Sequence, residues 1–308
     1  MRITVIGAGA MGSLYGAKLA QAGNEVTMVD VVPAVVEAIS SRGLILEEGQ
    51  VQHNLSVKAC FGQELKEPAE LVILFTKTMH SRAALDSVKE VLDKKTCLLS
   101  VQNGLGNIEL ISEYLPITQV IVGTTMFDSF LLGPGHVRTS SSGLMSIMSA
   151  DGVKNDRVVL MNELFNTAGL SCAIVENIME AIWEKVAFNA ATNTLAALTR
   201  LPDGLTIGTD ETRELAQKIA KEVVMVARAS GVNASEEKVL GKLGITVAEH
   251  GNHFPSMGQD ILRKSQTEIE SINGAVYRIA QTLGLEVPYT ETMYRLVRTI
   301  EKNYAKQM

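Results

Sequence analysis

The stretch 3-ITVIGAGAMG-12 decides how the first half of the chain folds. Its first four residues predict a buried strand. Its glycines have the spacing G-x-G-x-x-G directly after that strand and at the start of a helical pattern. The first glycine permits a tight turn, the second lets a pyrophosphate approach the backbone, and the third lets helix and strand pack closely. We therefore predict a dinucleotide-binding turn, against the alternative of a glycine-rich turn without a ligand. The predicted binding residues are Gly7, Ala8, Gly9, Ala10, Met11 and Gly12.

Asp30 ends the second predicted strand, residues 25–30, about 20 residues beyond the glycines. A carboxylate at this position accepts hydrogen bonds from the adenosine ribose and repels a 2′-phosphate. The next residues, Val31, Val32 and Pro33, supply no cation for such a phosphate. We therefore expect specificity for NAD(H), with NADP(H) as the alternative cofactor. A second interpretation of Asp30 is a residue that caps the following turn.

Strand and helix patterns alternate through the first half of the chain. This order predicts an α/β fold, with an N-terminal Rossmann-type doubly wound sheet that is mostly parallel. Gly133-Pro134-Gly135 then predicts a hairpin over 131–139. After residue 176 strand patterns stop and long helical patterns follow, including one over 178–198 and one over 259–283. We expect a dinucleotide-binding domain over 1–176 and an all-α, substrate-binding domain over 177–308.

The bulk composition excludes several classes of function. The chain has 308 residues, a net charge of −6 and no basic cluster, so it does not resemble a nucleic-acid binder. Three dispersed cysteines favour a reduced protein, and we expect a cytoplasmic location, with neither a signal peptide nor a membrane-spanning segment. The histidine spacing predicts no metal site. The helical half has enough apolar residues to support a homodimer.

Three polar residues, Lys185, Asn189 and Asn193, recur every fourth position in the apolar helical pattern of the second half. Four-residue steps place them on one broad helix face. Buried amides require partners, so this stripe predicts a polar ligand. The alternative is a solvated stripe on a surface helix. Glu268 lies in the second polar cluster, 267-TEIESING-274, where a lone glutamate is ordinarily a surface residue.

These motifs together resemble the ketopantoate reductase family over nearly the whole chain. The matching stretches are GAGAMG at 7–12, QNGLG at 102–106, WEK at 183–185 with Asn189 and Asn193, and Ser256 followed by TEIESING at 267–274. The resemblance implies reduction of 2-dehydropantoate (ketopantoate), a small 2-oxo acid, to D-pantoate, a step of pantothenate biosynthesis.

The resemblance also implies a role for each matched residue. Lys185 corresponds to the catalytic lysine that gives a proton to the carbonyl oxygen, and Glu268 to the acidic residue near the cofactor ribose and the substrate hydroxyl. Further implied substrate contacts are Asn189, Asn193 and Ser256. Further implied cofactor contacts are Lys77, Ser129 and Asn103, which also touches substrate.

Two positions depart from the family pattern. Asp30-Val31 stands where many members carry an arginine for the 2′-phosphate, and Asp203 stands where a substrate-binding asparagine is usual. At both positions the chain resembles the NAD-dependent D-2-hydroxyacid (D-mandelate-like) dehydrogenase branch of the family, which reduces branched or aromatic 2-oxo acids. The sequence is also compatible with a β-hydroxyacid dehydrogenase or a non-catalytic dinucleotide sensor. The reductase hypothesis requires the Lys185 ammonium and the nicotinamide to converge on one carbonyl group.

Overall fold

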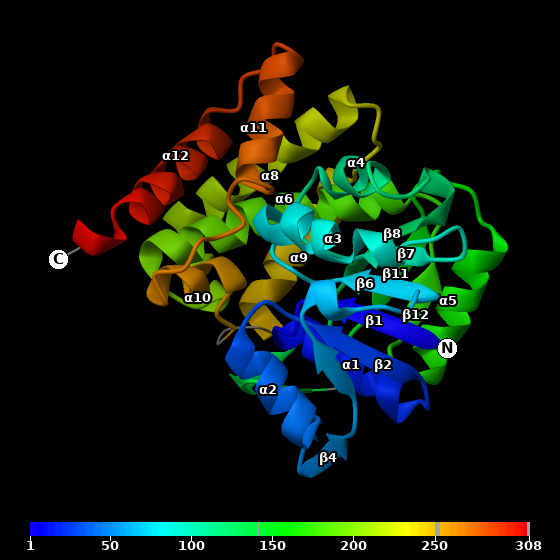
Figure 1. Ribbon diagram of the computed structural model, residues 1–308. Helices are drawn as coiled ribbons and strands as arrows, with labels where there is room; N and C mark the ends of the chain where they lie inside the picture. Colours follow the sequence, from blue (N-terminus) through cyan, green and yellow to red (C-terminus); the bar gives the residue numbers. More distant parts are fainter. Residues whose placement is uncertain (141, 250–252, 307–308) are drawn as a thin grey trace. The chain divides into compact units, whose positions relative to one another are not determined.

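The computed structural model of the protein describes residues 1–140, 142–249 and 253–306 (Figure 1). By its internal contacts the chain divides into two compact units. The first comprises residues 1–102 and 107–178, and the second comprises residues 103–106 and 179–308. Sequence analysis did not anticipate that the short segment 103–106 packs with the second unit.

An eight-stranded sheet forms the centre of the first unit, in the order β12-β11-β8-β7-β6-β1-β2-β5. The six strands from β8 to β5 in this order pair in parallel, whereas β11 runs antiparallel to β8. The predicted Rossmann-type sheet is therefore confirmed. Its strands are β1 (Arg2–Ile6), β2 (Glu25–Val29), β5 (Lys58–Cys60), β6 (Leu71–Leu74), β7 (Cys97–Ser100), β8 (Val120–Thr125), β11 (Met145–Ser149) and β12 (Cys172–Ile174).

Helix α1 shows why small residues follow the glycine motif. It packs against β1 and β2, and a Cβ atom added to Gly16 would lie 2.5 Å from the Met28 sulfur. A larger side chain would therefore push the helix off the sheet. The α-helices of this unit are α1 (Ala10–Gln21), α2 (Pro33–Arg42), α3 (Ser81–Val88), α4 (Asn107–Ser112) and α5 (Asp156–Thr167).

A second, four-stranded sheet in the first unit has the order β4-β3-β10-β9. The antiparallel pair β9 (Phe130–Gly133) and β10 (His136–Thr139) confirms the predicted hairpin. Sequence analysis missed its partners, β3 (Leu44–Glu48) and β4 (Val51–Leu55). Polar residues at the end of β3 and in the two-residue turn, Glu47, Glu48 and Gln50, interrupt the apolar alternation that would indicate two strands. Short 3₁₀ turns complete the chain at Gly62–Glu64, Thr78–His80, Lys89–Val91, Ile117–Gln119 and Tyr304–Lys306.

The second unit is built from helices, as predicted, around the long apolar helix α6 (Figure 1). Trp183, Val186, Ala187 and Ala190 of α6 belong to one buried cluster with residues of the neighbouring helices. In the described part of the chain, no helix is both long enough and apolar enough to cross a membrane. The helices are α6 (Ile178–Thr199), α7 (Asp203–Thr206), α8 (Asp210–Ala229), α9 (Glu236–Glu249), α10 (Ser256–Leu262), α11 (Asn273–Thr282) and α12 (Pro288–Lys302).

The single helix predicted over 259–283 is wrong. Helix α10 stops at Leu262, and α11 starts only at Asn273. Lys264 has a φ of 53°, a left-handed conformation that ends the first helix. The backbone between the helices bonds to other segments, because the Thr267 N–H donates to Glu301 Oε1 and the Ser271 carbonyl accepts from Leu105. A non-helical segment therefore carries the predicted residue Glu268.

Candidate active site

The glycine turn has the geometry that each of its three glycines was predicted to provide. Gly7 has a φ of 94°, which favours glycine, and its N–H donates to the Val29 carbonyl at 2.8 Å. A Cβ atom on Gly12 would lie 1.8 Å from the Gly7 carbonyl oxygen, whereas one on Gly9 would meet nothing within 4 Å. Gly9 also precedes α1 without a side chain that could occupy the first N–H groups of the helix. The turn is therefore tight at one end, packed at the other and open in the middle, which fits a pyrophosphate.

Asp30 ties the glycine turn to the end of β2. Its Oδ2 atom accepts a hydrogen bond from the Ala8 N–H at 2.7 Å, and its Oδ1 atom accepts one from the Val32 N–H at 2.9 Å. The second bond is the turn cap that sequence analysis considered as the second interpretation, and the first joins this carboxylate to the predicted phosphate-binding loop. Val31 is 80% exposed, so the residue after Asp30 presents an apolar side chain to solvent.

Further predicted cofactor residues lie in segments that follow β6 and β8 of the same unit. Ser129 donates from Oγ to the Ala10 carbonyl at 2.8 Å, which places it beside the first turn of α1. Lys77 follows β6 and precedes the 3₁₀ turn at Thr78–His80. Sequence analysis missed a role for Gln102, whose side-chain amide donates to the Thr76 carbonyl at 2.6 Å and fixes the loop that carries Lys77.

The polar stripe of α6 is withdrawn from solvent. Lys185 and Asn189 are partly buried, and Asn193 is buried with its Oδ1 atom accepting from Thr192 Oγ1 at 3.3 Å. A solvated surface stripe would leave these side chains exposed, so that alternative does not describe this helix. The pKa of the Lys185 ammonium is lowered to about 8, mainly by burial and also by the charge of Lys242, while Glu268 acts in the raising direction.

Glu268 lies within reach of Asn103, although 165 residues separate them in the chain. The Asn103 side-chain amide donates to Glu268 Oε2 at 3.1 Å. The adjoining backbone pairs as well, because the Leu105 N–H donates to the Ser271 carbonyl at 2.8 Å. Gly104 has a φ of 84°, and a Cβ atom there would lie 2.4 Å from the Ser271 carbonyl oxygen. Only glycine allows the backbone at position 104 to come this close to Ser271, so Gly104 permits segment 103–106 to pack with the second unit.

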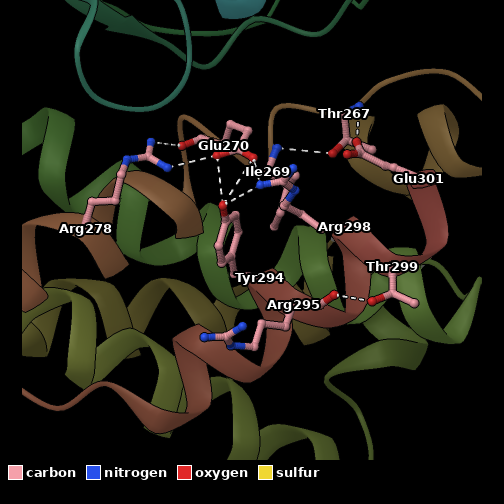
Figure 2. A network of polar contacts seen from close by, with 9 residues as sticks. All are labelled: Thr267, Ile269, Glu270, Arg278, Tyr294, Arg295, Arg298, Thr299 and Glu301. Atoms are coloured by element: carbon pink, nitrogen blue, oxygen red, sulfur yellow. Dashed lines mark hydrogen bonds and ion pairs between the residues drawn. The ribbon is translucent and has the colours of Figure 1, made fainter.

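A network of ion pairs holds the segment that carries Glu268 (Figure 2). Glu270 accepts from Arg278 at 2.9 Å and from the Tyr294 hydroxyl at 3.0 Å, and it also pairs with Arg298. Glu301 of α12 accepts from the Thr267 N–H at 2.6 Å. Helices α11 and α12 therefore fix both sides of Glu268. The motif TEIESING contains Glu270, but periodicity gave no signal for its partners on other helices.

Two further predicted positions have contrasting surroundings. Ser256 is exposed at the first residue of α10. Asp203 is only 3% exposed, and its N–H donates to the His253 carbonyl at 2.9 Å. Its Oδ1 atom has no hydrogen-bond partner in the described residues, and burial raises the pKa of its carboxyl to about 7. Asp203 therefore carries less negative charge at neutral pH than an exposed aspartate does.

Two models of known families match this chain. "Ketopantoate reductase PanE/ApbA" matches residues 3–152, and "Ketopantoate reductase PanE/ApbA C terminal" matches residues 177–301. The chain belongs to the ketopantoate reductase family. Similar proteins include the 2-dehydropantoate 2-reductases of Streptococcus pyogenes, 30% identical over 302 residues, and of Pyrococcus horikoshii, 33% identical over 301 residues. Each match covers 98% of this chain and 98% of the relative.

Solved structures of this family and of a related enzyme share the fold. A ternary structure of D-mandelate dehydrogenase with NADH and anilino(oxo)acetate has a TM-score of 0.94 at 28% identity, covering 98% of this chain and 99% of that chain. A ketopantoate reductase from Ralstonia eutropha has a TM-score of 0.90 at 30% identity, with the same coverage. This chain is accordingly an oxidoreductase with a nicotinamide dinucleotide cofactor.

The ketopantoate reductase fold divides the predicted site residues between the two units. The first unit brings together the glycine turn, Asp30 and Ser129. The second unit joins Asn103 to Glu268 and couples Glu268 electrostatically to Lys185. Chemically, the first group suits an adenosine diphosphate, and the second suits proton transfer to a developing alkoxide.

Proposed function

We propose that this chain reduces 2-dehydropantoate to D-pantoate, with NADH as the hydride donor and Lys185 as the proton donor. The observation that carries the proposal is the partly buried ammonium of Lys185, whose pKa of about 8 responds to Glu268. The relatives support the choice of substrate, because proteins named 2-dehydropantoate 2-reductase are similar to this chain over nearly their full length.

The pKa of Lys185 suits a general acid. Reduction of the C2 carbonyl places negative charge on its oxygen, and an ammonium group stabilises that charge and donates the proton. With a pKa of about 8, Lys185 is mostly charged at neutral pH yet releases its proton more readily than an exposed lysine. Glu268 raises this pKa and so keeps the donor charged before the reaction. After transfer, the neutral amine regains a proton from water.

The glycine turn and Asp30 support the choice of NADH. When bound, NADH supplies the hydride to the carbonyl carbon. Gly9 leaves the backbone open for the pyrophosphate, and the remaining lone pairs of the Asp30 carboxylate can accept from the ribose hydroxyls. Residues 31–36 read Val-Val-Pro-Ala-Val-Val, so they offer no cation to a 2′-phosphate. We assign Lys77, Ser129 and Glu268 to further cofactor contacts.

We assign the substrate contacts to the neutral polar side chains of the second unit. Asn189 and Asn193 follow Lys185 at successive turns of α6, so their amides face the same side of the helix as the proton donor. Asn103 and Ser256 complete the set. Amide and hydroxyl donors suit a 2-oxo acid, because its carboxylate and carbonyl oxygens are acceptors. A cytoplasmic location and a homodimer stay predictions of the sequence.

Steady-state kinetics on a panel of oxo acids tests the function. We expect kcat/KM for 2-dehydropantoate with NADH to exceed the values for 2-ketoisocaproate and phenylglyoxylate by at least about tenfold, the discrimination that a few well-placed contacts provide. A preference for phenylglyoxylate would instead identify a D-2-hydroxyacid dehydrogenase, the function that the Asp30-Val31 departure favours. Turnover with none of these acids would contradict both.

The same assay tests the cofactor with one double variant. Asp30→Ser with Val31→Arg removes the repelling carboxylate and adds a cation for the 2′-phosphate. We expect the ratio of kcat/KM values for NADPH and NADH to rise by about 100-fold, as expected for a charge-assisted contact replacing a repulsion. A wild-type enzyme that already prefers NADPH by about tenfold would contradict the role assigned to Asp30.

A further inference from the structure

A second lysine lies beside the proton donor. Lys242 belongs to α9, is partly buried, and places its Nζ atom 4.7 Å from the centre of the Phe188 ring. Phe188 is three residues after Lys185 on α6, so the two side chains are neighbours on the surface of that helix. The cation–π contact therefore seats the Lys242 ammonium on a ring that neighbours the proton donor on α6. Neither the helical pattern nor the family resemblance singled out Lys242.

The charges around this pair come from three elements. Burial lowers the pKa of Lys242, and Glu184 of α6 offsets part of that lowering. Glu184 also accepts from the Ser235 N–H at 3.0 Å and pairs with Lys238 at 3.7 Å, so it is shared among several donors. Glu268, from the segment before α11, acts on Lys185 in the opposite direction to Lys242. A cation and a carboxylate thus act on the Lys185 pKa in opposite directions.

We propose that Lys242 is a positioning residue of the reductase reaction, whose ammonium, seated on the Phe188 ring, sets how readily Lys185 releases its proton. A like charge nearby destabilises the charged form of a lysine, and a proton donor works best when its proton affinity matches the working pH. The direction agrees with the effect of Lys242 on Lys185, whose pKa it lowers. The inference rests on the proposed function, because it assigns Lys185 the donor role.

The pH dependence of kcat/KM for the oxo acid, at saturating NADH, tests the proposal on the full-length enzyme. Reduction requires charged Lys185, so activity falls as pH rises through the pKa of this lysine. In Lys242→Met the repulsion is gone and the Lys185 pKa rises. We expect the basic limb of the profile to move up by at least about half a pH unit, as for a charge pair near a protein surface. Lys242→Arg keeps the charge and should restore the wild-type limb.

Lys238→Met is the matched control, because Lys238 precedes Lys242 by one turn of α9 and its side chain is 69% exposed. Solvent screens its charge, so its profile should match the wild type. The proposal would be overturned if the basic limb of the kcat/KM profile did not move in Lys242→Met, or if it moved equally in Lys242→Met and Lys238→Met. Should Lys242→Met not fold, Lys242→Gln and an NMR titration of ¹³C-methylated Lys185 give the same comparison. Absence of oxo-acid reduction in the wild type would instead contradict the proposed function.

Discussion

The glycine turn of the first unit and the Lys185 region of the second unit are assembled in different ways. Six consecutive residues make the turn, and the Asp30 carboxylate accepts a hydrogen bond from its backbone. The Lys185 region combines residues from position 103 to position 268. A site made from one short stretch can therefore be predicted from sequence, whereas for a site assembled by tertiary packing the sequence indicates only some of the residues.

The largest stability effect should come from the packed end of the glycine turn. Gly12→Ala places a Cβ atom against the Gly7 carbonyl, so helix and strand must separate. We expect a loss of about 3 kcal/mol or more in the free energy of unfolding, at the upper end of overpacking costs. Chemical denaturation measures it.

Gly9→Ala is the matched variant in the same turn. Gly9 has an ordinary extended conformation and open space around its added Cβ atom, so its unfolding free energy should stay within about 1 kcal/mol of the wild type. Its NADH affinity should fall, because the new methyl group stands where the pyrophosphate approaches. Equal stability of the two variants would show that the packed and open ends of the turn are not distinct.

A buried carboxyl of the second unit should give a smaller, pH-dependent effect. The pKa of Asp203 is about 7 in the folded protein, above its unfolded value, so the folded state binds the proton more tightly. Stability contributed by this proton is present at low pH and is lost as pH rises toward and through 7. Asp203→Asn keeps the shape without the charge, and should raise the unfolding free energy at pH 8 by about 1–3 kcal/mol.

Denaturation at about pH 4 and about pH 8, on either side of the Asp203 pKa, checks this prediction. At the lower pH the Asp203 variant and the wild type should differ little. Asp210→Asn is the control, because the Asp210 side chain is 96% exposed. An equal difference between Asp203→Asn and the wild type at both pH values would place the carboxyl in a solvated or paired environment.

The smallest effect should come from the network around Glu270. Glu270→Gln weakens the ion pairs with Arg278 and Arg298 that hold the Glu268 segment, at a cost of about 0.5–1.5 kcal/mol because the pairs are partly exposed. Glu268 then holds its position less firmly, and kcat/KM for the oxo acid should fall about threefold to tenfold. Glu291→Gln breaks a comparable pair with Arg295 on α12 and should leave kinetics intact. Equal kinetic losses in both variants would contradict the positioning role.

Sequence patterns predicted the sheet, the hairpin at Gly133-Pro134-Gly135 and the helical second unit, because each depends on local periodicity or turn chemistry. They failed over 263–272, where the pattern is helical but Lys264 adopts a left-handed conformation and the backbone bonds to Leu105 and Glu301. They also missed Lys242, because the sequence does not show that this helical lysine contacts the Phe188 ring of another helix. The conformation and partners of such residues depend on tertiary contacts, which local patterns in a single sequence do not predict.

NADH affinity and single-turnover hydride transfer, measured in parallel for Lys185→Ala and Gly9→Ala, test whether cofactor binding and proton donation are separate functions of the two units. We expect Lys185→Ala to bind NADH within about twofold of the wild type, while transfer to 2-dehydropantoate slows by about 1,000-fold, within the range for loss of a general acid that also stabilises charge. Gly9→Ala should show the reverse, weak binding with most of the rate restored at saturating NADH. Near wild-type transfer in Lys185→Ala would show that Lys185 is not the proton donor.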